Sequence, residues 1–203
     1  MDKLLLPKTY LSYSAMTMWL KSPDRFKREY FENAEKLDTK YLRFGKGVAK
    51  MIEDGSHTSI LPDLPVYDTP EHEIHCEVMG VPVLGFIDSY NSIDNVFLEY
   101  KTGKKPWSQS LVQKHDQLPF YAMLLKHTIG EIPLHCDLVW IETEDSQSDE
   151  SGPFSNEKKI NVTGNVKSFR REFDYREIER MEELVVKVAN EISDAYKEWL
   201  KDI

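Results

Sequence analysis

The chain has 203 residues, of which 40% are hydrophobic, and a formal net charge of −9 at pH 7. A chain of this length can bury a core of its own, so no disulfide or structural metal is needed to hold it together. It has no run of about 18 apolar residues, which argues against a membrane-spanning helix. Two cysteines, Cys76 and Cys136, and the absence of a signal-peptide pattern near the N-terminus lead us to expect free thiols and a cytoplasmic location.

The acidic balance bears on the class of partner. DNA-binding proteins are often basic, so a net charge of −9 argues at first sight against nucleic acid. Carboxylates that hold metal ions are negative by necessity, however, and contacts to phosphate need only a local basic groove. The objection is therefore weaker for an enzyme than for a DNA-binding module.

Two helical segments are predicted near the N-terminus. The first covers residues 12–31 and has a break where Ser22, Pro23 and Asp24 supply an N-cap, a proline at the first helical position and an acid in the first turn. The second runs from about residue 41 to 54.

A two-residue hydrophobic period follows, which is typical of strands. It predicts strands at 74–80, 81–90 and 96–101, with a turn at 91–95. Three sequential short strands with tight links favour an antiparallel meander.

The helical pattern returns at residues 108–127. A fresh helix capped by Asp116 would place Pro119 in its first turn, where the missing N–H costs least. A strand is predicted at 134–142, and the polar stretch 144–155 is expected to form a mobile loop.

The clearest helix is the last one, at 174–202. Asp174 and Glu177 have capping-box spacing, and apolar residues then recur every three or four positions as far as Trp199. We expect this face to pack on the core and to carry no chemistry. The chain is therefore expected to form one α/β domain over 1–203. In chain order it would consist of a helical segment at 10–35, a core at about 41–142 and the last helix.

Three residues with chemical potential are predicted to meet on neighbouring strands. Glu99 and Lys101 are two positions apart, so their side chains share one face. Asp88 lies on the preceding strand, and the turn at 91–95 places it roughly opposite Glu99. Two carboxylates about 5 Å apart repel each other unless a cation lies between them, and Mg²⁺ or Mn²⁺ suits such oxygen ligands. A lysine beside them can orient or deprotonate a water or stabilise charge on a phosphate, as phosphodiester hydrolysis requires.

The tripeptide pattern alone is weak. Asp/Glu-x-Lys begins at Asp38, at Glu99 and at Glu157. Only the copy at Glu99 lies on a predicted strand with an aspartate one hairpin earlier. From this geometry alone, a solvated salt-bridge cluster on a sheet face remains the simpler explanation.

Longer motifs surround these residues. They are Gly-Phe-Ile-Asp at 85–88, Glu-Tyr-Lys-Thr-Gly-Lys at 99–104, Gln117 and Tyr121 in Gln-x-x-x-Tyr spacing, Ser-Tyr-Ser at 12–14 with Ser-Pro-Asp-Arg-Phe at 22–26, and Phe-Gly-Lys-Gly-Val-Ala at 44–49. In this order and spacing, over about residues 10–142, they resemble the RecB-like branch of the PD-(D/E)XK nuclease superfamily, in the exonuclease form found in phages and prophages. The expected order of helix, three strands, helix and strand agrees with the restriction-endonuclease-like core of that family.

The resemblance implies a metal site. Glu53, Asp88, Glu99 and the backbone carbonyl of Tyr100 would bind Mg²⁺ or Mn²⁺. Many RecB-like nucleases carry a histidine where this chain has Ala49. Glu53 lies one helical turn onward on the same face and either replaces that ligand or is an ordinary exposed acid.

The resemblance also implies roles for three other side chains. Lys101 would position and activate the attacking water, and Gln117 and Tyr121 would hold the substrate or the lysine. Iron–sulfur members carry a cysteine where this chain has Ser22, with three more near the C-terminus. A cubane cluster needs four thiolates and this chain has two cysteines, so we expect no iron–sulfur cluster.

DNA contacts are expected around the predicted site. Each basic residue there is also explained by ordinary solvated surface, and the tryptophan either stacks on a base or anchors its loop on the core. The residues are Arg43, Lys46, Lys104, Lys105, Lys114 and Trp107.

The sequence therefore predicts a metal-dependent DNA nuclease. The resemblance implies an exonuclease of phage recombination or DNA repair in the bacterial host cytoplasm, with DNA and a phage single-strand annealing or recombination protein as partners. Two other classes stay open. One is a DNA-binding module that has lost a metal ligand, which Ala49 favours, and the other is a structural or accessory protein, which the acidic balance favours.

Overall fold

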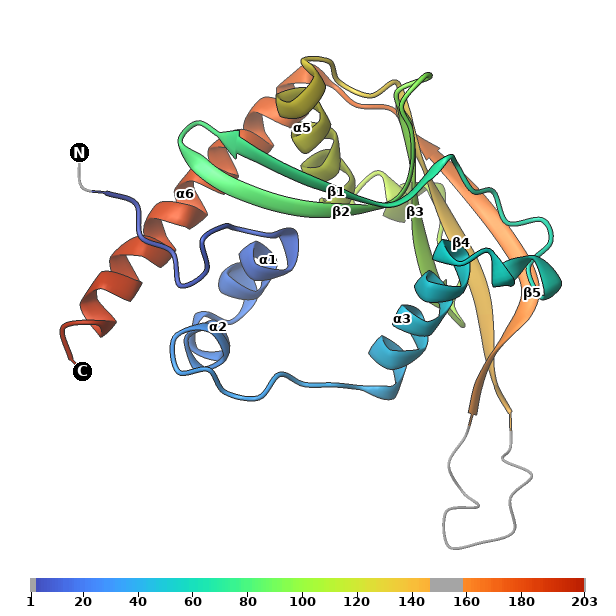
Figure 1. Ribbon diagram of the computed structural model, residues 1–203, viewed down its shortest axis with the longest axis horizontal. Helices are drawn as coiled ribbons and strands as arrows, with labels where there is room; N and C mark the ends of the chain where they lie inside the picture. Colours follow the sequence, from blue (N-terminus) through green and yellow to red (C-terminus); the bar gives the residue numbers. More distant parts are fainter. Residues whose placement is uncertain (1–2, 147–158, 203) are drawn as a thin grey trace, which may run out of the picture.

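The structure is a computed structural model that describes residues 3–146 and 159–202 (Figure 1). No helix in these two ranges is both long and apolar enough to cross a membrane. In chain order the elements are α1 (Tyr13–Lys21), α2 (Pro23–Tyr30), α3 (Lys40–Glu53), the 3-10 helix η1 (Ser56–Ser59), β1 (Thr69–Val78), β2 (Val81–Asn91), β3 (Val96–Gly103), α4 (Gln109–Val112), α5 (Gln117–Ile129), β4 (His135–Ser146), β5 (Lys159–Arg171) and α6 (Tyr175–Trp199).

The strands of the described chain form one five-stranded sheet in the order β1-β2-β3-β4-β5. The antiparallel meander of β1, β2 and β3 is confirmed. After α5 the chain returns as β4, which lies parallel to β3, and β5 then pairs antiparallel with β4. The sheet is therefore mixed, as a restriction-endonuclease-like α/β core requires.

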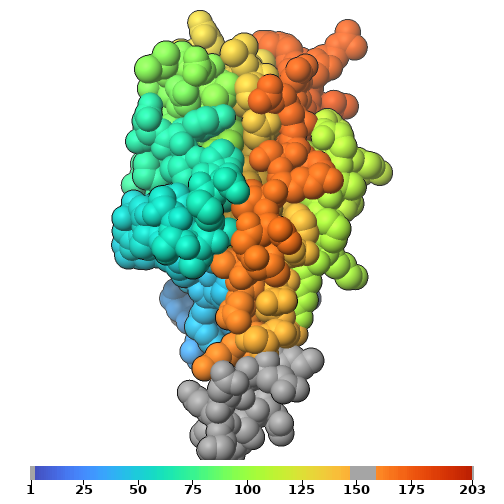
Figure 2. Space-filling view, turned by 90° about the vertical axis from the view of Figure 1, so that its right-hand side faces the viewer, coloured from blue at the N-terminus to red at the C-terminus, as the bar shows by residue number. Residues whose placement is uncertain are grey.

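The sequence analysis missed β5. Residues 144–146 of the expected polar loop belong to β4, and the remainder of that loop lies outside the described residues. β5 forms the edge of the sheet, and only Phe169 and Arg171 of its side chains are buried. Figure 2 shows β5 running along one side of the molecule, between the segment around η1 and the segment that leads to α4. A strand with so little burial carries a weak hydrophobic signal.

Two layers of side chains cover the sheet. On one face, α1, α2, α5 and α6 contribute the larger core, into which Phe97 and Leu138 of the central strands point. On the other face, α3 and the segment around η1 cover Leu98 and Val139. Alternation along β3 thus sends Phe97, Glu99 and Lys101 to the α5 side, and this decides which helix the catalytic candidates meet.

Local signals explain most helix boundaries. The Ser12 hydroxyl accepts a hydrogen bond from Ala15 N, and α2 begins at Pro23, which confirms the predicted break. Asp116 precedes α5 as expected, with Pro119 in the first turn, but the Asp116 side chain makes no capping hydrogen bond. The capping box of α6 also differs from the prediction. Asp174 accepts a hydrogen bond from the backbone N–H of Arg176, and Glu177, the second acid of the box, pairs with Arg171.

Gly85 allows α5 to lie close to β2. A Cβ atom built on Gly85 would lie 2.3 Å from Leu124 Cδ1 and 3.2 Å from a ring carbon of Tyr121. A side chain at this position would therefore require Leu124 and Tyr121 to repack. The glycine thus allows the middle of α5, where these two residues lie, to approach β2 closely.

Candidate active site

The site forms where β2 and β3 separate. Next to their turn, Ser89 pairs with Leu98. One step further along the register, Asp88 and Glu99 occupy the facing positions. Here a hydrogen bond to the Asp88 side chain takes the place of a backbone hydrogen bond between the strands. Its Oδ2 accepts a hydrogen bond from the backbone N–H of Tyr100 at 2.6 Å. The expectation that Asp88 lies opposite Glu99 agrees with this register.

Glu99 is buried, with 2% of its surface exposed. Its Oε1 accepts a hydrogen bond from Lys101 Nζ at 2.5 Å. Its Oε2 is also buried and has no hydrogen-bond partner in the part of the chain that the structure describes. A buried carboxylate oxygen without a donor is costly, and such oxygens often await a ligand or ion.

A chain of hydrogen bonds leads from this carboxylate to α5. Lys101 Nζ donates a second bond to Gln117 Oε1 at 2.8 Å. The side-chain amide of Gln117 in turn donates from Nε2 to the Tyr121 hydroxyl at 2.9 Å. The Gln-x-x-x-Tyr spacing, one helical turn, places both side chains on the same face of α5 and so fixes the position of the ammonium group.

The electrostatics of the site are those of crowded, buried charges. Burial and the neighbouring charge of Glu99 raise the pKa of Asp88 well above its usual value, against smaller opposing effects of the Tyr100 N–H and Lys101. Burial alone would lower the pKa of Lys101, but the charge and hydrogen bond of Glu99 outweigh it and raise that pKa. Lys101 is therefore a cation near neutral pH, while the two acids repel each other.

These groups line a common hollow of about 390 Å³, whose wall comes from α3, from β2 and β3 where they separate, and from the first residue of α5. Its polar lining includes Asp88, Glu99, Lys101 and Gln117, and α3 contributes Ala49. The hollow is open to solvent on one side and reaches the buried carboxylates on the other. A substrate phosphate can therefore approach the acids from outside.

The donor set fits a hard divalent cation. Asp88 and Glu99 supply carboxylate oxygens, and the unpartnered Oε2 of Glu99 is an acceptor with nothing yet bound to it in residues 3–146 and 159–202. Mg²⁺ is commonly held by one or two carboxylates together with waters and substrate phosphates. Within those residues, however, no three His, Cys, Asp or Glu side chains converge closely enough to form a ready metal-binding group.

The comparison with protein families decides the identity of this arrangement. The model of the PD-(D/E)XK nuclease superfamily matches residues 67–200, which include every strand and the helices α5 and α6. The chain belongs to the PD-(D/E)XK nuclease superfamily. The predicted resemblance is confirmed at this level, and nucleases of this superfamily generally use divalent metal ions.

Solved structures share the superfamily fold. A protein of Eubacterium rectale to which exonuclease activity has been attributed superposes with a TM-score of 0.57 at 12% identity, over 91% of this chain and 82% of that protein. A phage related exonuclease from Haemophilus somnus 129PT superposes with a TM-score of 0.55 at 14% identity, over 93% of this chain and 82% of the other. A search of curated proteins found no match.

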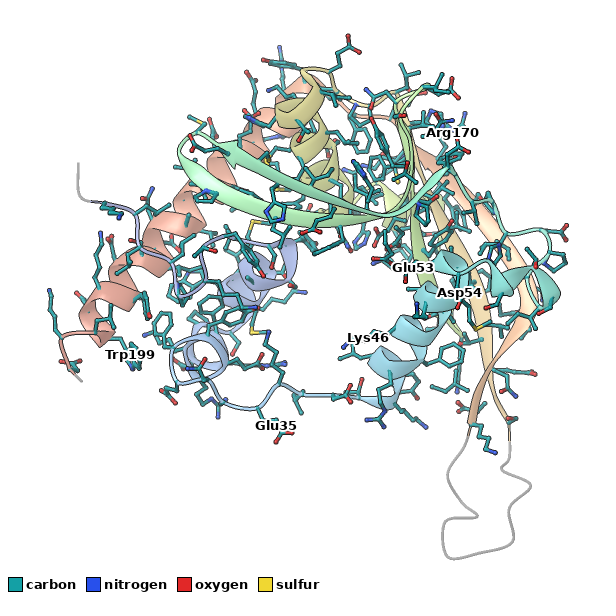
Figure 3. All side chains as sticks on the ribbon, viewed as in Figure 1. Glu35, Lys46, Glu53, Asp54, Arg170 and Trp199 are labelled. Atoms are coloured by element: carbon teal, nitrogen blue, oxygen red, sulfur yellow. The ribbon has the colours of Figure 1, made fainter. Side chains whose placement is uncertain are left out.

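The sequence analysis expected a third metal ligand, Glu53, on α3, the helix that precedes the sheet. The Glu53 carboxylate lies 3.4 Å from Lys50 Nζ, and about half of its side-chain surface is exposed. It lies at the end of α3 nearest the sheet (Figure 3) but is not part of the lining of the hollow. Ala49, at the position where a histidine was expected, does line it.

The predicted DNA-contacting residues have different surroundings. Lys46 lines the hollow and extends from α3 toward the left in Figure 3. Arg43 pairs with Asp38 at 3.0 Å, outside the hollow. Trp107 packs against the core and lies 5.0 Å from the His115 ring, which favours the anchoring role over base stacking.

The remaining basic candidates lie outside the hollow. Lys104 pairs with Asp145, whereas Lys105 and Lys114 are exposed. None of the three contributes to the lining of the hollow as the structure describes it. A role in DNA binding for these residues stays a prediction.

A second hollow adjoins the first through Gln117. It measures about 280 Å³; Gln117 lines both hollows, and Tyr121 lines the second. Its other lining residues come largely from α1, α2 and the segments beside them: Lys8, Tyr10, Ser12, Tyr13, Ser14, Tyr30 and Lys36. Among them, Tyr13 has its pKa raised to about 12 by burial and by the charges of Asp116 and Glu99.

The sequence analysis did not assign a role to Tyr13. It belongs to the Ser-Tyr-Ser motif, which was noted only as part of the family resemblance.

Proposed function

We propose that this chain is a divalent-metal-dependent DNA nuclease that hydrolyses phosphodiester bonds. The observation that supports this most strongly is the arrangement in one hollow of Asp88, the unpartnered Oε2 of Glu99, and Lys101 held by Gln117. Within the described residues, Glu99 keeps a buried acceptor beside a second carboxylate, in a chain of a nuclease superfamily.

Each residue has a role that follows from its position. Asp88, Glu99 and the carbonyl of Tyr100 would hold Mg²⁺ or Mn²⁺, which when bound polarises the phosphoryl oxygen and lowers the pKa of a bound water. Lys101 reaches the hollow as a cation and stabilises negative charge that grows on the phosphate, or orients the attacking water. Gln117 and Tyr121 keep the lysine in place.

We infer that the substrate is DNA and that the enzyme acts as an exonuclease in phage recombination or DNA repair. The names of the two structural neighbours support exonuclease action, and one of them is described as phage related. The second hollow supports it as well, because tyrosine rings, serine hydroxyls and the ammonium groups of lysines suit a nucleotide strand that passes beyond Gln117. The partner that we propose for this role is a phage single-strand annealing or recombination protein.

A second candidate function is a DNA-binding protein on the same fold that has lost catalysis. Ala49 is the observation that favours it, since the α3 position that lines the hollow carries no ligand. The two candidates differ in their response to metal, because only an enzyme turns over substrate when the cation is added.

The experiment is a cleavage assay on end-labelled linear DNA with Mn²⁺, with Mg²⁺ and with excess EDTA. We expect cleavage with either metal and none in EDTA, and Asp88→Asn should be inactive under every condition. Linear and covalently closed DNA separate exonuclease from endonuclease action. Cleavage that continues in EDTA would refute the proposed mechanism, whereas metal-independent DNA binding without cleavage would support the second candidate.

A further inference from the structure

A divalent ion such as Mg²⁺ takes about six oxygen ligands, and two acids can supply only some of them. Only Asp88 and Glu99 among its lining residues carry a carboxylate in the described structure. The adjacent helix presents Ala49, and Glu53 is paired with Lys50 at the rim. A further carboxylate must come from elsewhere in the fold if the site has one.

Glu71 on β1 occupies the register position that faces Asp88. The pairs on either side of it are Pro70 with Ser89 and His72 with Ile87. Facing residues of an antiparallel pair have Cβ atoms roughly 5 Å apart on the same face of the sheet. α3, which bounds the hollow, packs against both β1 and β3.

The electrostatics place the Glu71 carboxylate within range of the site. Burial raises the pKa of Glu71, and the charges of Glu53 and Glu99 raise it further. Glu71 is in turn one of the charges that raise the pKa of Asp88. Its side chain is half-buried and makes no salt bridge within residues 3–146 and 159–202, so no ion pair holds it in one rotamer.

The backbone at Glu71 is held in an unusual conformation. Its φ is 48°, in the left-handed region that non-glycine residues enter rarely. Strained backbone of this kind persists where the surroundings enforce it, often at functional sites. The strain alone names no ligand, but the unpartnered and buried Oε2 of Glu99 does, because it marks the same hollow as awaiting a cation.

We propose that Glu71 supplies the third carboxylate toward the divalent ion, beside Asp88 and Glu99, in place of a ligand from α3. The inference rests on the proposed nuclease function and identifies a further residue of its metal site. Three carboxylates repel one another without a cation, which explains why they do not converge in the described structure. When a cation neutralises that repulsion, the three rotatable bonds of Glu71 allow its carboxylate to approach Asp88 across the strand pair.

The test compares Mn²⁺ affinity, measured by calorimetry at one pH, for the wild type, Glu71→Gln, Glu53→Gln and Asp88→Asn. Glutamine keeps the shape of glutamate and removes its charge. We expect Glu71→Gln to weaken Mn²⁺ binding by about tenfold or more, Glu53→Gln to bind like the wild type, and Asp88→Asn to bind weakest. Wild-type affinity in Glu71→Gln, or a loss confined to Glu53→Gln, would overturn the inference.

A backbone control separates the carboxylate from the strained conformation. Glu71→Gly removes the side chain but accepts a positive φ without cost, so the melting temperature of the metal-free protein should not fall. Its Mn²⁺ affinity should fall as far as that of Glu71→Gln. A glycine variant that binds Mn²⁺ like the wild type would contradict a ligand role.

The same measurements distinguish the inference from the proposed function. A wild type that binds Mn²⁺ through Glu71 but does not cut DNA would refute the nuclease proposal and leave the ligand assignment standing. A wild type that cuts DNA while Glu71→Gln keeps full Mn²⁺ affinity would do the reverse. A wild type that binds no Mn²⁺ would refute both.

Discussion

Asp88 and Tyr100 are joined by a hydrogen bond in which a side chain replaces the backbone of a strand. The Asp88 Oδ2 accepts from the Tyr100 N–H at 2.6 Å, one position beyond the point where Ser89 pairs with Leu98. The bond satisfies a backbone donor that the separating strand leaves unpaired. It also fixes the carboxylate of Asp88, a candidate metal ligand, at the opening between β2 and β3, so the sheet itself positions the acid.

Replacement of Asp88 by asparagine tests this double role. The asparagine side-chain oxygen can still accept from Tyr100, so Asp88→Asn should fold normally while DNA cleavage falls below detection. The pKa of Asp88 is higher in the folded state than in the unfolded state. The free energy of unfolding of the metal-free wild type therefore falls as pH rises from the unfolded-state pKa toward the folded-state pKa. The variant avoids that loss and should therefore be more stable near neutral pH, with the difference disappearing below about pH 4. Thermal melts of both proteins in EDTA across this pH range measure it, and a less stable variant at pH 7 would contradict the raised pKa.

Metal affinity should depend on pH through the same group. A carboxylate must be deprotonated to bind a cation, and the pKa of Asp88 is raised by burial and by the charge of Glu99. Mn²⁺ affinity should fall as pH is lowered, with the fall beginning well above the ordinary aspartate value of 3.8. Calorimetric titrations between pH 5 and 8, roughly the range in which the protein should stay folded, measure this dependence. An affinity that stays constant across this pH range would contradict it.

Gln117 should act through Lys101. Gln117→Leu removes the acceptor 2.8 Å from Lys101 Nζ and also the donor to the Tyr121 hydroxyl. We expect cleavage to fall by about ten- to a hundredfold, because a mispositioned catalytic group costs rate steeply. Tyr121→Phe keeps the ring packing and should lose less. A Gln117→Leu enzyme with a normal rate would show that Glu99 alone holds the lysine.

The core of the site was predictable because short-range rules determine it. A two-residue period places Glu99 and Lys101 on one face, and a short turn brings Asp88 beside them. Helical periodicity likewise predicts that Gln117 and Tyr121 share a face. Each of these relations is confined to one element or one hairpin.

The parts that were missed depend on contacts between distant segments. β5 is an edge strand beyond the polar stretch. Its pairing with β4 follows from the assembled sheet and not from its own hydrophobic pattern. The contact of Arg171 with the carbonyl oxygens of Val112 and His115 joins β5 to the segment before α5, and no periodicity foretells it. Tyr13 reaches the site only because α1 packs against α5, where its ring lies 5.5 Å from that of Phe120.

Gly85 should be intolerant of even a small side chain. A methyl group there would collide with Leu124 and press on Tyr121, so Gly85→Ala should destabilise the protein by about 1–3 kcal/mol and reduce cleavage through displacement of Gln117. Gly47→Ala is the matched control, because a Cβ atom at this α3 position meets nothing within 4 Å. That change should stabilise the helix by roughly 0.5–1 kcal/mol. Urea unfolding of both variants compares them, and equal stabilities would contradict the close approach of α5.

Lys101 provides the most direct test of the chemistry. Its raised pKa keeps the ammonium protonated, so its charge rather than its basicity is available to the substrate in the metal-free state. If it stabilises phosphate charge, Lys101→Arg should retain part of the activity and Lys101→Ala should lose about 10²–10³-fold. If it removes a proton from water instead, arginine cannot replace it, because guanidinium does not deprotonate in proteins.

The controls for Lys101 separate catalysis from binding. DNA affinity in Ca²⁺, which fills such a site without supporting turnover, should change little in either variant, because the loss concerns the transition state more than the bound substrate. Lys187→Ala on α6, whose side chain is 69% exposed and remote from the hollow, should cleave at the wild-type rate. Single-turnover cleavage rates for the three variants, set beside their Ca²⁺-supported affinities, decide the matter. Wild-type cleavage by Lys101→Ala would remove this lysine from the catalytic machinery, and the 2.5 Å contact with Glu99 would then be a structural ion pair.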